Sequence, residues 1–200
     1  MTQVSDRLAS LSPSATLAMS QKSGELKAQG IDVINLSVGE PDFNTPDFIK
    51  EAAKKAIDDN FSRYSPVAGY PALRNAIVAK LKNENGLEYT AGQISCANGA
   101  KQSVCNTVMV LVNPGDEVII PAPFWVSYPE MVKLAEGTPV IVPAGIEQDF
   151  KITPAQLEAA ITPKTKALIL QPDGFCLQRR GIGRFSGSIE KTSGYHRYSG

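Results

Sequence analysis

The second half of the chain alternates short apolar runs with segments whose apolar residues recur at helical spacing. Short apolar runs predict strands, and apolar positions three or four residues apart predict helices. We therefore expect strands over 94–97, 117–120, 138–142 and 167–170, and helices over 102–111, 128–134 and 154–161. Strands that are apolar throughout and separated by helices indicate a mostly parallel sheet covered on both faces. The predicted fold class is α/β.

The first half of the chain is predicted to be mainly helical. Pro13 and Gly30 bracket an amphipathic helix that carries Leu17 and Leu26, because proline favours the start of a helix and glycine the position after its end. The remaining pattern predicts a strand over 33–36, helices over 46–57 and 71–85, and an Asn-Pro-Gly-Asp turn at 113–116.

Composition and charge exclude several classes of protein. The 200 residues include 20 Lys+Arg and 20 Asp+Glu, and 42% are hydrophobic, which excludes collagen-like, disordered and disulfide-scaffold chains. A net charge of zero gives no electrostatic reason to expect nucleic acid or an anionic membrane as a partner. Three scattered cysteines and the absence of a Cys-x-x-Cys pair predict no metal site. Without a secretory signal or a run of about 18 apolar residues, a cytoplasmic protein is expected.

The neutral total conceals a break near the end of the chain. Residues 171–200 carry five basic and two acidic residues, a net charge of +3, so residues 1–170 carry 15 against 18, a net charge of −3. Four of the seven arginines and the single histidine also fall in these last thirty residues. Such a shift is typical of a tail or of a second module.

The segment Asn-Gly-Ala-Lys-Gln at 98–102 lies between a predicted strand and a predicted helix. The free backbone N–H groups at the start of a helix attract anions, so Gly99, Ala100 and Lys101 are candidates for binding a phosphate or a carboxylate. The alternative is an ordinary strand-to-helix turn with Lys101 as a solvated side chain.

A second candidate follows the next predicted strand, where Trp125 is the single tryptophan of the chain. Ligands bind at the carboxyl edge of open parallel sheets, and an indole there can cover a flat heteroaromatic ring. The alternative is a tryptophan packed in the core. Two loops, at 36–43 and 62–71, are compatible with simple turn chemistry, and taken singly none of these segments identifies a function.

Together, and in this order, the motifs resemble the amino-terminal part of the class I aminotransferases, the fold-type I enzymes that depend on pyridoxal phosphate. The resemblance covers residues 1 to about 170 and is closest to the bacterial aspartate aminotransferase branch. It is carried by Ser-Ala-Thr at 14–16 with Met19, Leu-Ser-Val-Gly-Glu-Pro-Asp-Phe at 36–43, Tyr-Ser-Pro-Val-Ala-Gly at 64–69, Asn-Gly-Ala-Lys-Gln at 98–102, Asn-Pro-Gly-Asp-Glu-Val at 113–118 and Pro-Ala-Pro-Phe-Trp-Val-Ser-Tyr-Pro at 121–129.

The resemblance implies a role for each candidate residue. The Gly39 backbone would meet the α-carboxylate of the substrate, and the main chain of 99–101 would hold the cofactor phosphate. Trp125 would stack on the pyridine ring and border the substrate. Tyr64 would reach the phosphate of the partner subunit's cofactor, because family members are homodimers with shared active sites. A dianionic phosphate suits a helix N-terminus, and a planar ring suits an aromatic cover.

The implied activity is transfer of an amino group between an amino acid, aspartate in this branch, and a 2-oxo acid. Alternatives within the fold are a carbon–sulfur lyase or an aromatic aminotransferase. The implied domains are an N-terminal helix with a small-domain segment over 1–46, an incomplete cofactor-binding large domain over 47–170, and a non-native tail over 171–200.

The resemblance also implies groups that this sequence lacks. The family's Asn-Pro-x-Gly and Asp-x-x-Tyr segments, its catalytic lysine and its carboxylate-binding arginine come later in the chain than 98–102, and no lysine here stands in the expected context. We therefore expect no catalytic residue in this chain, which would be an inactive, truncated product.

The tail suggests an origin for that absence. Residues 171–178 can be back-translated so that reading one nucleotide later gives Asn-Pro-Thr-Gly-Ser-Val-Tyr, so we hypothesise that 171–200 is an out-of-frame translation. The glycines at 181, 183 and 187 miss the spacing of a nucleotide-binding loop, and a nucleic-acid-binding arm is not favoured.

Overall fold

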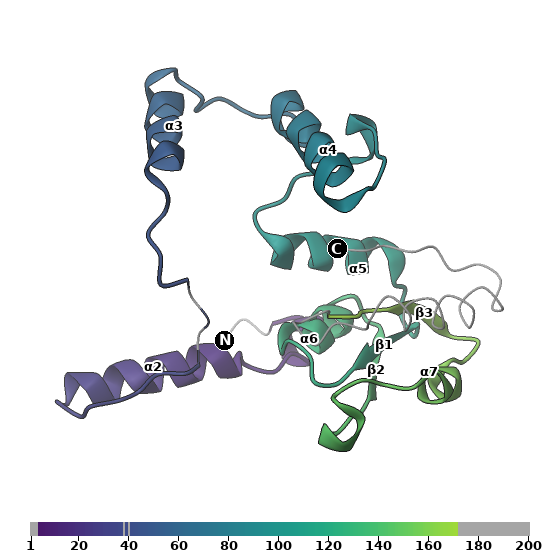
Figure 1. Cartoon of the computed structure of the whole chain (residues 1–200). Coiled ribbons are helices and arrows are strands. Elements are labelled where there is room, and N and C mark those ends of the chain that lie inside the picture. The colour runs from purple at the N-terminus through teal and green to yellow at the C-terminus, as the bar shows by residue number, and fades with distance from the viewer. Residues whose placement is uncertain (1–3, 38, 40, 172–200) are drawn as a thin grey trace. The chain divides into compact units, whose positions relative to one another are not determined.

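Three parallel strands form a sheet in the order β2, β1, β3 (Figure 1). Their bounds are β1 Glu117–Pro121, β2 Thr138–Val142 and β3 Thr165–Leu168. One side of β1 pairs with β2 along its whole length, and the other side pairs with β3 through Val118 opposite Ala167. The predicted parallel sheet of an α/β fold is confirmed, and the first of its strands lies in the middle.

The structure is a computed structural model that describes residues 4–37, 39 and 41–171. Among these residues no helix is both long enough and apolar enough to cross a membrane. The hypothesis of an out-of-frame tail concerns residues that, after Gln171, lie outside the described part of the chain.

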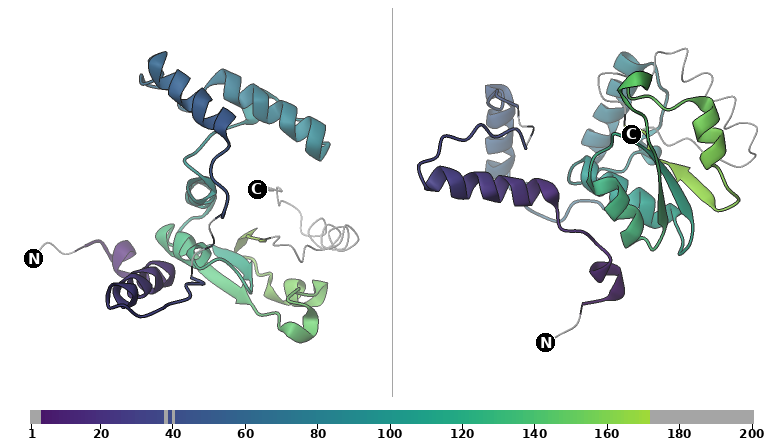
Figure 2. Two further views of the ribbon diagram at one scale, coloured as in Figure 1. Left: turned by 60° about the vertical axis from the view of Figure 1, so that its left-hand side comes forward. Right: turned by 90° about the horizontal axis from the view of Figure 1, so that it is seen from below.

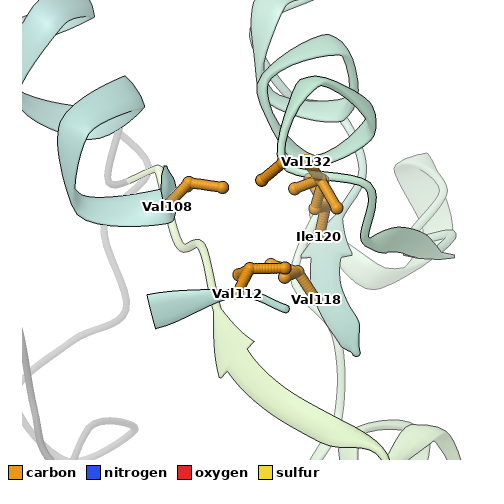
Figure 3. Close-up of a cluster of buried hydrophobic side chains, with 6 residues drawn as sticks. Val108, Val112, Val118, Ile120 and Val132 are labelled. Atoms are coloured by element: carbon orange, nitrogen blue, oxygen red, sulfur yellow. The ribbon is translucent and has the colours of Figure 1, made fainter. Parts of the chain in front are cut away.

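Strand β1 is buried on both faces because its side chains alternate between two apolar clusters. Val118 and Ile120 belong to a cluster with residues of α5 (Ala100–Leu111) and α6 (Ser127–Leu134), drawn in Figure 3. Ile119 belongs to a second cluster that includes Leu157 of α7 (Pro154–Ala160). In Figure 2 the helix after β1 and the helix after β2 lie on opposite sides of the sheet. This alternation is the period-two pattern of a strand covered on both sides.

The chain forms two compact units. We call residues 1–25 with 104–200 the sheet unit and residues 26–103 the helical unit. Helix α5 begins in the helical unit and continues into the sheet unit. Among the described residues, every buried apolar side chain belongs to the sheet unit. The predicted domain boundaries after residues 46 and 170 remain predictions.

Three helices of the first half begin and end close to where the sequence predicts: α2 Ala15–Ala28, α3 Asp47–Asp58 and α4 Pro71–Asn85. Helix α1 (Asp6–Ala9) and the 3-10 turn η1 (Ala91–Gln93) were not predicted. Pro71 is the first residue of α4, and Gly86 ends it with a φ of +67°, a conformation that costs glycine nothing. A second 3-10 turn, η2 (Ile146–Gln148), was not predicted either.

Three predictions about these elements are wrong. Residues 33–36 and 94–97 are not strands, because a strand needs a hydrogen-bonded partner and the Cys96 amide instead donates to the carbonyl of Ala68, in a loop. Helix α2 is not amphipathic: Leu17 is 71% exposed, whereas Ser23 is buried. Its apolar residues do not share one face.

The turn predicted at 113–116 is confirmed. The Asp116 amide donates to the carbonyl of Asn113 at 3.0 Å, and the Asp116 carboxylate accepts from the Asn113 amide at 2.8 Å. Gly115 has a φ of +85°, which glycine adopts without strain. The turn places the end of α5 directly before β1.

The N-terminal arm, residues 5–12, is held on α6 by Glu130. The Ser12 amide donates to Glu130 Oε2 at 2.8 Å, and Lys133 Nζ donates to Glu130 Oε1 at 2.9 Å. Burial alone would raise the pKa of the Glu130 carboxyl, but the hydrogen bonds from Lys133 and Ser12 and the Lys133 charge together lower it. The arm is thus attached to the carboxylate form of Glu130.

The first prediction compares two isoleucines that face each other in the register of β1 and β2. Ile120 is fully buried, whereas its partner Ile141 is 42% exposed. Ile120→Ala should lower the free energy of unfolding of the sheet unit by about 2–5 kcal/mol, because it leaves a cavity. Ile141→Ala should lower the same free energy of unfolding by less than about 1 kcal/mol. Urea denaturation followed by Trp125 fluorescence measures both, and equal losses would contradict the assigned core.

The second prediction concerns the pH dependence of the arm. A carboxyl whose pKa is lowered on folding stabilises the fold above its ordinary pKa of 4.5 and loses that contribution as the pH falls through the lowered value. Glu130→Gln should therefore speed hydrogen exchange of the Ser12 amide roughly two- to fivefold at pH 6, a modest factor because the pair is partly exposed.

The difference between Glu130→Gln and the unmodified chain should vanish well below pH 4.5. Glu136→Gln is the control, because its carboxylate meets Arg7 only at 3.9 Å with both side chains about half exposed. An effect of Glu130→Gln that is equal at both pH values would show that the carboxylate charge does not hold the arm.

Candidate functional site

The first candidate site is the N-terminus of α5, where Gly99 turns the chain into the helix. Gly99 has a φ of +83°, and a Cβ added to it would meet no atom within 4 Å. Its carbonyl accepts the first helical hydrogen bonds, from the amides of Gln102 and Ser103. The Gln102 side chain reaches back and accepts from the Asn98 amide at 2.5 Å. The turn is therefore fixed by its own backbone and by one glutamine.

This geometry suits an anion. The first N–H groups of a helix have no acceptor within the helix and carry the positive end of its dipole. Ala100 and Lys101 are the first two residues of α5, and both are exposed. The open space beside Gly99 lets a ligand approach the main chain closely. Gly99, Ala100 and Lys101 thus form the turn into α5, and their binding of a phosphate remains a prediction.

The second candidate, Trp125, lies four residues after the end of β1. Its neighbour Phe124 packs against the first apolar cluster, whereas Trp125 packs edge-on against Tyr128, with 5.5 Å between ring centroids and 88° between ring planes. Trp125 is half-buried. The two rings thus form a T-shaped contact, one of the preferred arrangements of aromatic pairs.

The carboxyl ends of β1 and β3 are joined beside this tryptophan. The Trp125 amide donates to the side chain of Gln171 at 3.0 Å, three residues beyond the end of β3. The Ala122–Pro123 peptide bond that precedes the segment is cis. Trp125 therefore lies at the carboxyl edge of the parallel sheet, the edge at which such sheets bind ligands.

The other two candidates lie in exposed segments of the helical unit. Tyr64 is fully exposed in the loop before α4, and Gly39 is exposed between α2 and α3. The loop that carries Tyr64 is tied to the segment before Gly99, because the Cys96 amide donates to the Ala68 carbonyl at 3.0 Å. Tyr64 and Gly99 thus share the helical unit, whereas Trp125 belongs to the sheet unit.

Sequence reasoning missed three residues that support these positions. Gln102 was part of a motif but had no assigned role, although glutamine at the third helical position is a known capping signal. Gln171 was assigned to the tail rather than to the sheet edge. Arg74 was not singled out, although a cation near the start of a helix opposes the helix dipole and so indicates another contact.

Comparison with protein families and curated relatives gives consistent matches. The sequence profile of the family "Aminotransferase class I and II" matches residues 31–172. The aspartate/prephenate aminotransferase of Cereibacter sphaeroides is 57% identical over 169 residues, which make up 84% of this chain and 42% of that relative. The aspartate aminotransferase of Geobacillus stearothermophilus is 53% identical over 169 residues, 84% of this chain and 43% of that relative.

Solved structures give the same result for the fold. The aspartate aminotransferase from Thermus thermophilus with maleate matches with a TM-score of 0.92 and 39% identity, over 98% of this chain and 52% of that one. The aspartate aminotransferase from Rhizobium meliloti matches with a TM-score of 0.90 and 37% identity, over 96% and 49%. The chain spans about half of these structures and less than half of the curated relatives.

Proposed function

Because the chain belongs to the class I and II aminotransferase family, we propose that it forms part of a pyridoxal-phosphate-dependent aminotransferase. The reaction moves an amino group from an amino acid to a 2-oxo acid. The observation that carries the proposal is the N-terminus of α5, where a left-handed glycine with open space beside it opens the helix.

The phosphate of the cofactor fits this turn. The main-chain N–H groups of Ala100 and Lys101 would hold it beside the Gly99 backbone, whose own N–H donates to the Ala97 carbonyl. The helix dipole favours the negative charge of the phosphate. The Lys101 side chain adds a positive charge in the same turn. A side chain at position 99 would stand in the space the phosphate needs, and glycine leaves that space open.

The ring of the cofactor fits Trp125. The indole packs against Tyr128 with the two ring planes nearly perpendicular, at the carboxyl edge of the sheet. There it would cover a flat heteroaromatic ring and exclude water from it. When bound, pyridoxal phosphate withdraws electrons from the amino acid's α-carbon and so makes its proton removable. The residues of this chain would bind and orient the cofactor for that chemistry.

The proposed substrate is an acidic amino acid. Relatives named aspartate aminotransferase support this assignment, and so does the structure described with maleate, which is a dicarboxylate. Gly39 would receive the substrate's α-carboxylate through its backbone, and Trp125 would border the substrate. The name aspartate/prephenate aminotransferase favours prephenate as a second substrate, because prephenate is itself a 2-oxo acid.

The proposed assembly is a homodimer in the cytoplasm. Tyr64 would then reach the phosphate of the cofactor in the partner subunit, a role compatible with its full exposure in a loop of the helical unit.

The chain's own lysines are not proposed to be catalytic. The resemblance places the catalytic lysine beyond the matched stretch. We therefore expect this chain to bind the cofactor reversibly and not to catalyse transamination by itself.

The third prediction uses Trp125 as a reporter, since it is the single tryptophan of the chain. Pyridoxal phosphate should quench its fluorescence saturably, and pyridoxal without phosphate should bind at least about tenfold more weakly, because the helix N-terminus contributes through the phosphate. Absence of saturable quenching, or equal binding of both compounds, would contradict the proposal.

Two glycine variants give this titration a matched control. Gly99→Ala and Gly86→Ala each place alanine in a left-handed conformation with open space around it, at a similar cost of about 1–2 kcal/mol. Only Gly99→Ala should weaken binding of pyridoxal phosphate. Borohydride treatment of the complex should not attach the cofactor to one specific lysine. Attachment of one cofactor per chain at a single lysine would contradict the expected reversible binding.

A further inference from the structure

Arg74 of α4 binds two backbone carbonyls that lie close together in the chain. Its Nε donates to the carbonyl of Ile94 at 3.0 Å, and its Nη2 donates to the carbonyl of Ala91. Arg74 is half-buried, in a unit whose described residues bury no apolar side chain. The guanidinium therefore holds η1 and the following residue, Ile94, close to the start of α4.

A second contact holds the next residues of the same segment. A Cβ added to Gly69 would lie 2.7 Å from Cys96 Sγ and 2.8 Å from Cys96 Cβ, so the Cys96 side chain rests directly on the Gly69 backbone. The Cys96 amide donates to the neighbouring Ala68 carbonyl at 3.0 Å. Gly69 has a φ of +96°, so a larger residue there would be both strained and in collision.

These contacts join the two parts of the helical unit that are proposed to reach cofactor phosphates. Cys96 lies three residues before Gly99, and Ala68 lies four residues after Tyr64. Between Cys96 and the helix, the amides of Asn98 and Gly99 are also engaged, with Gln102 and with the Ala97 carbonyl. The position of the turn is thus set from α4 on one side and from α5 on the other.

We propose that Arg74 is a positioning residue for the phosphate-binding turn at Gly99–Lys101. It acts through the segment from Ala91 to Cys96 and does not itself touch the phosphate. The identity of the ligand rests on the proposed function, whereas the effect of Arg74 on the backbone before Gly99 does not.

The chemistry of arginine explains the residue type. One planar guanidinium presents several N–H donors in a fixed arrangement and can satisfy both carbonyls, whereas a lysine ammonium is a single point of attachment on a flexible stem. The positive charge opposes the dipole at the start of α4, so helix stability does not favour arginine at this position. The two carbonyls supply the compensating interaction.

The experiment compares Arg74→Met, Arg74→Lys and the control Lys82→Met in the whole chain. Lys82 is an exposed residue of the same helix, paired with Glu88 at 3.5 Å, so its replacement removes the same charge without touching the segment. Two quantities are measured: hydrogen exchange of the Cys96 amide, and the affinities for pyridoxal phosphate and for pyridoxal from Trp125 quenching.

Arg74→Met should speed hydrogen exchange of the Cys96 amide about tenfold, because the hydrogen bonds from the charged guanidinium are lost. It should also lower the affinity for pyridoxal phosphate about tenfold. The affinity for pyridoxal without phosphate should stay the same, which a general loss of structure would not allow. Arg74→Lys should restore part of both effects, and Lys82→Met should change neither.

Unchanged exchange of the Cys96 amide in Arg74→Met would overturn the proposal, and so would faster exchange with an unchanged affinity for pyridoxal phosphate. If the unmodified chain does not bind pyridoxal phosphate, the proposed function fails. The positioning of the turn by Arg74 is then supported by faster exchange and refuted by unchanged exchange.

Discussion

The structure depends on the burial of β1 on both of its faces. Val118, Ile119 and Ile120 are fully buried, and they alternate between two apolar clusters on opposite sides of the sheet. A strand of this kind needs helices on both faces of its sheet, and β1 lies between two parallel neighbours. Its carboxyl end then has a fixed place, and there Trp125 and Gln171 meet. The place of Trp125, which is proposed to cover the cofactor ring, thus depends on the burial of Val118, Ile119 and Ile120.

The helical unit is held together by different means. Its described residues bury no apolar side chain, and several large ones, such as Phe43 and Val67, are largely exposed. Polar contacts define its local geometry: the capping box of Thr90 and Gln93 in η1, and the guanidinium of Arg74 on two carbonyls. A unit with few buried contacts opens at low free energy. The turn at Gly99–Lys101 therefore needs contacts that hold the segment before it, and those of Arg74 and Gly69 supply them.

Much of this could be predicted from the sequence where the signal is local. The apolar run of β1, the proline that opens α4 and the glycine that ends it each act within a few residues, and these elements lie where expected. The resemblance to the aspartate aminotransferase branch, carried by separated motifs, is confirmed by relatives that are 50–57% identical. Its expected α/β fold is confirmed by solved structures with TM-scores up to 0.92.

Features that depend on a distant partner could not be predicted. Residues 33–36 and 94–97 have the composition of strands, but a strand exists only where a neighbour completes its hydrogen bonds, and composition does not reveal the neighbour. The role of Arg74 was hidden for the same reason, since its acceptors are backbone carbonyls 17 and 20 residues further along. The proposed binding of the cofactor phosphate at the start of α5 is best measured from the Ala100 and Lys101 amide resonances during titration with pyridoxal phosphate and with pyridoxal. We expect both amides to shift with one dissociation constant for pyridoxal phosphate, and to shift only at higher concentrations of pyridoxal. Unshifted Ala100 and Lys101 amides, or shifts at equal concentrations of both compounds, would show that the turn does not bind the phosphate.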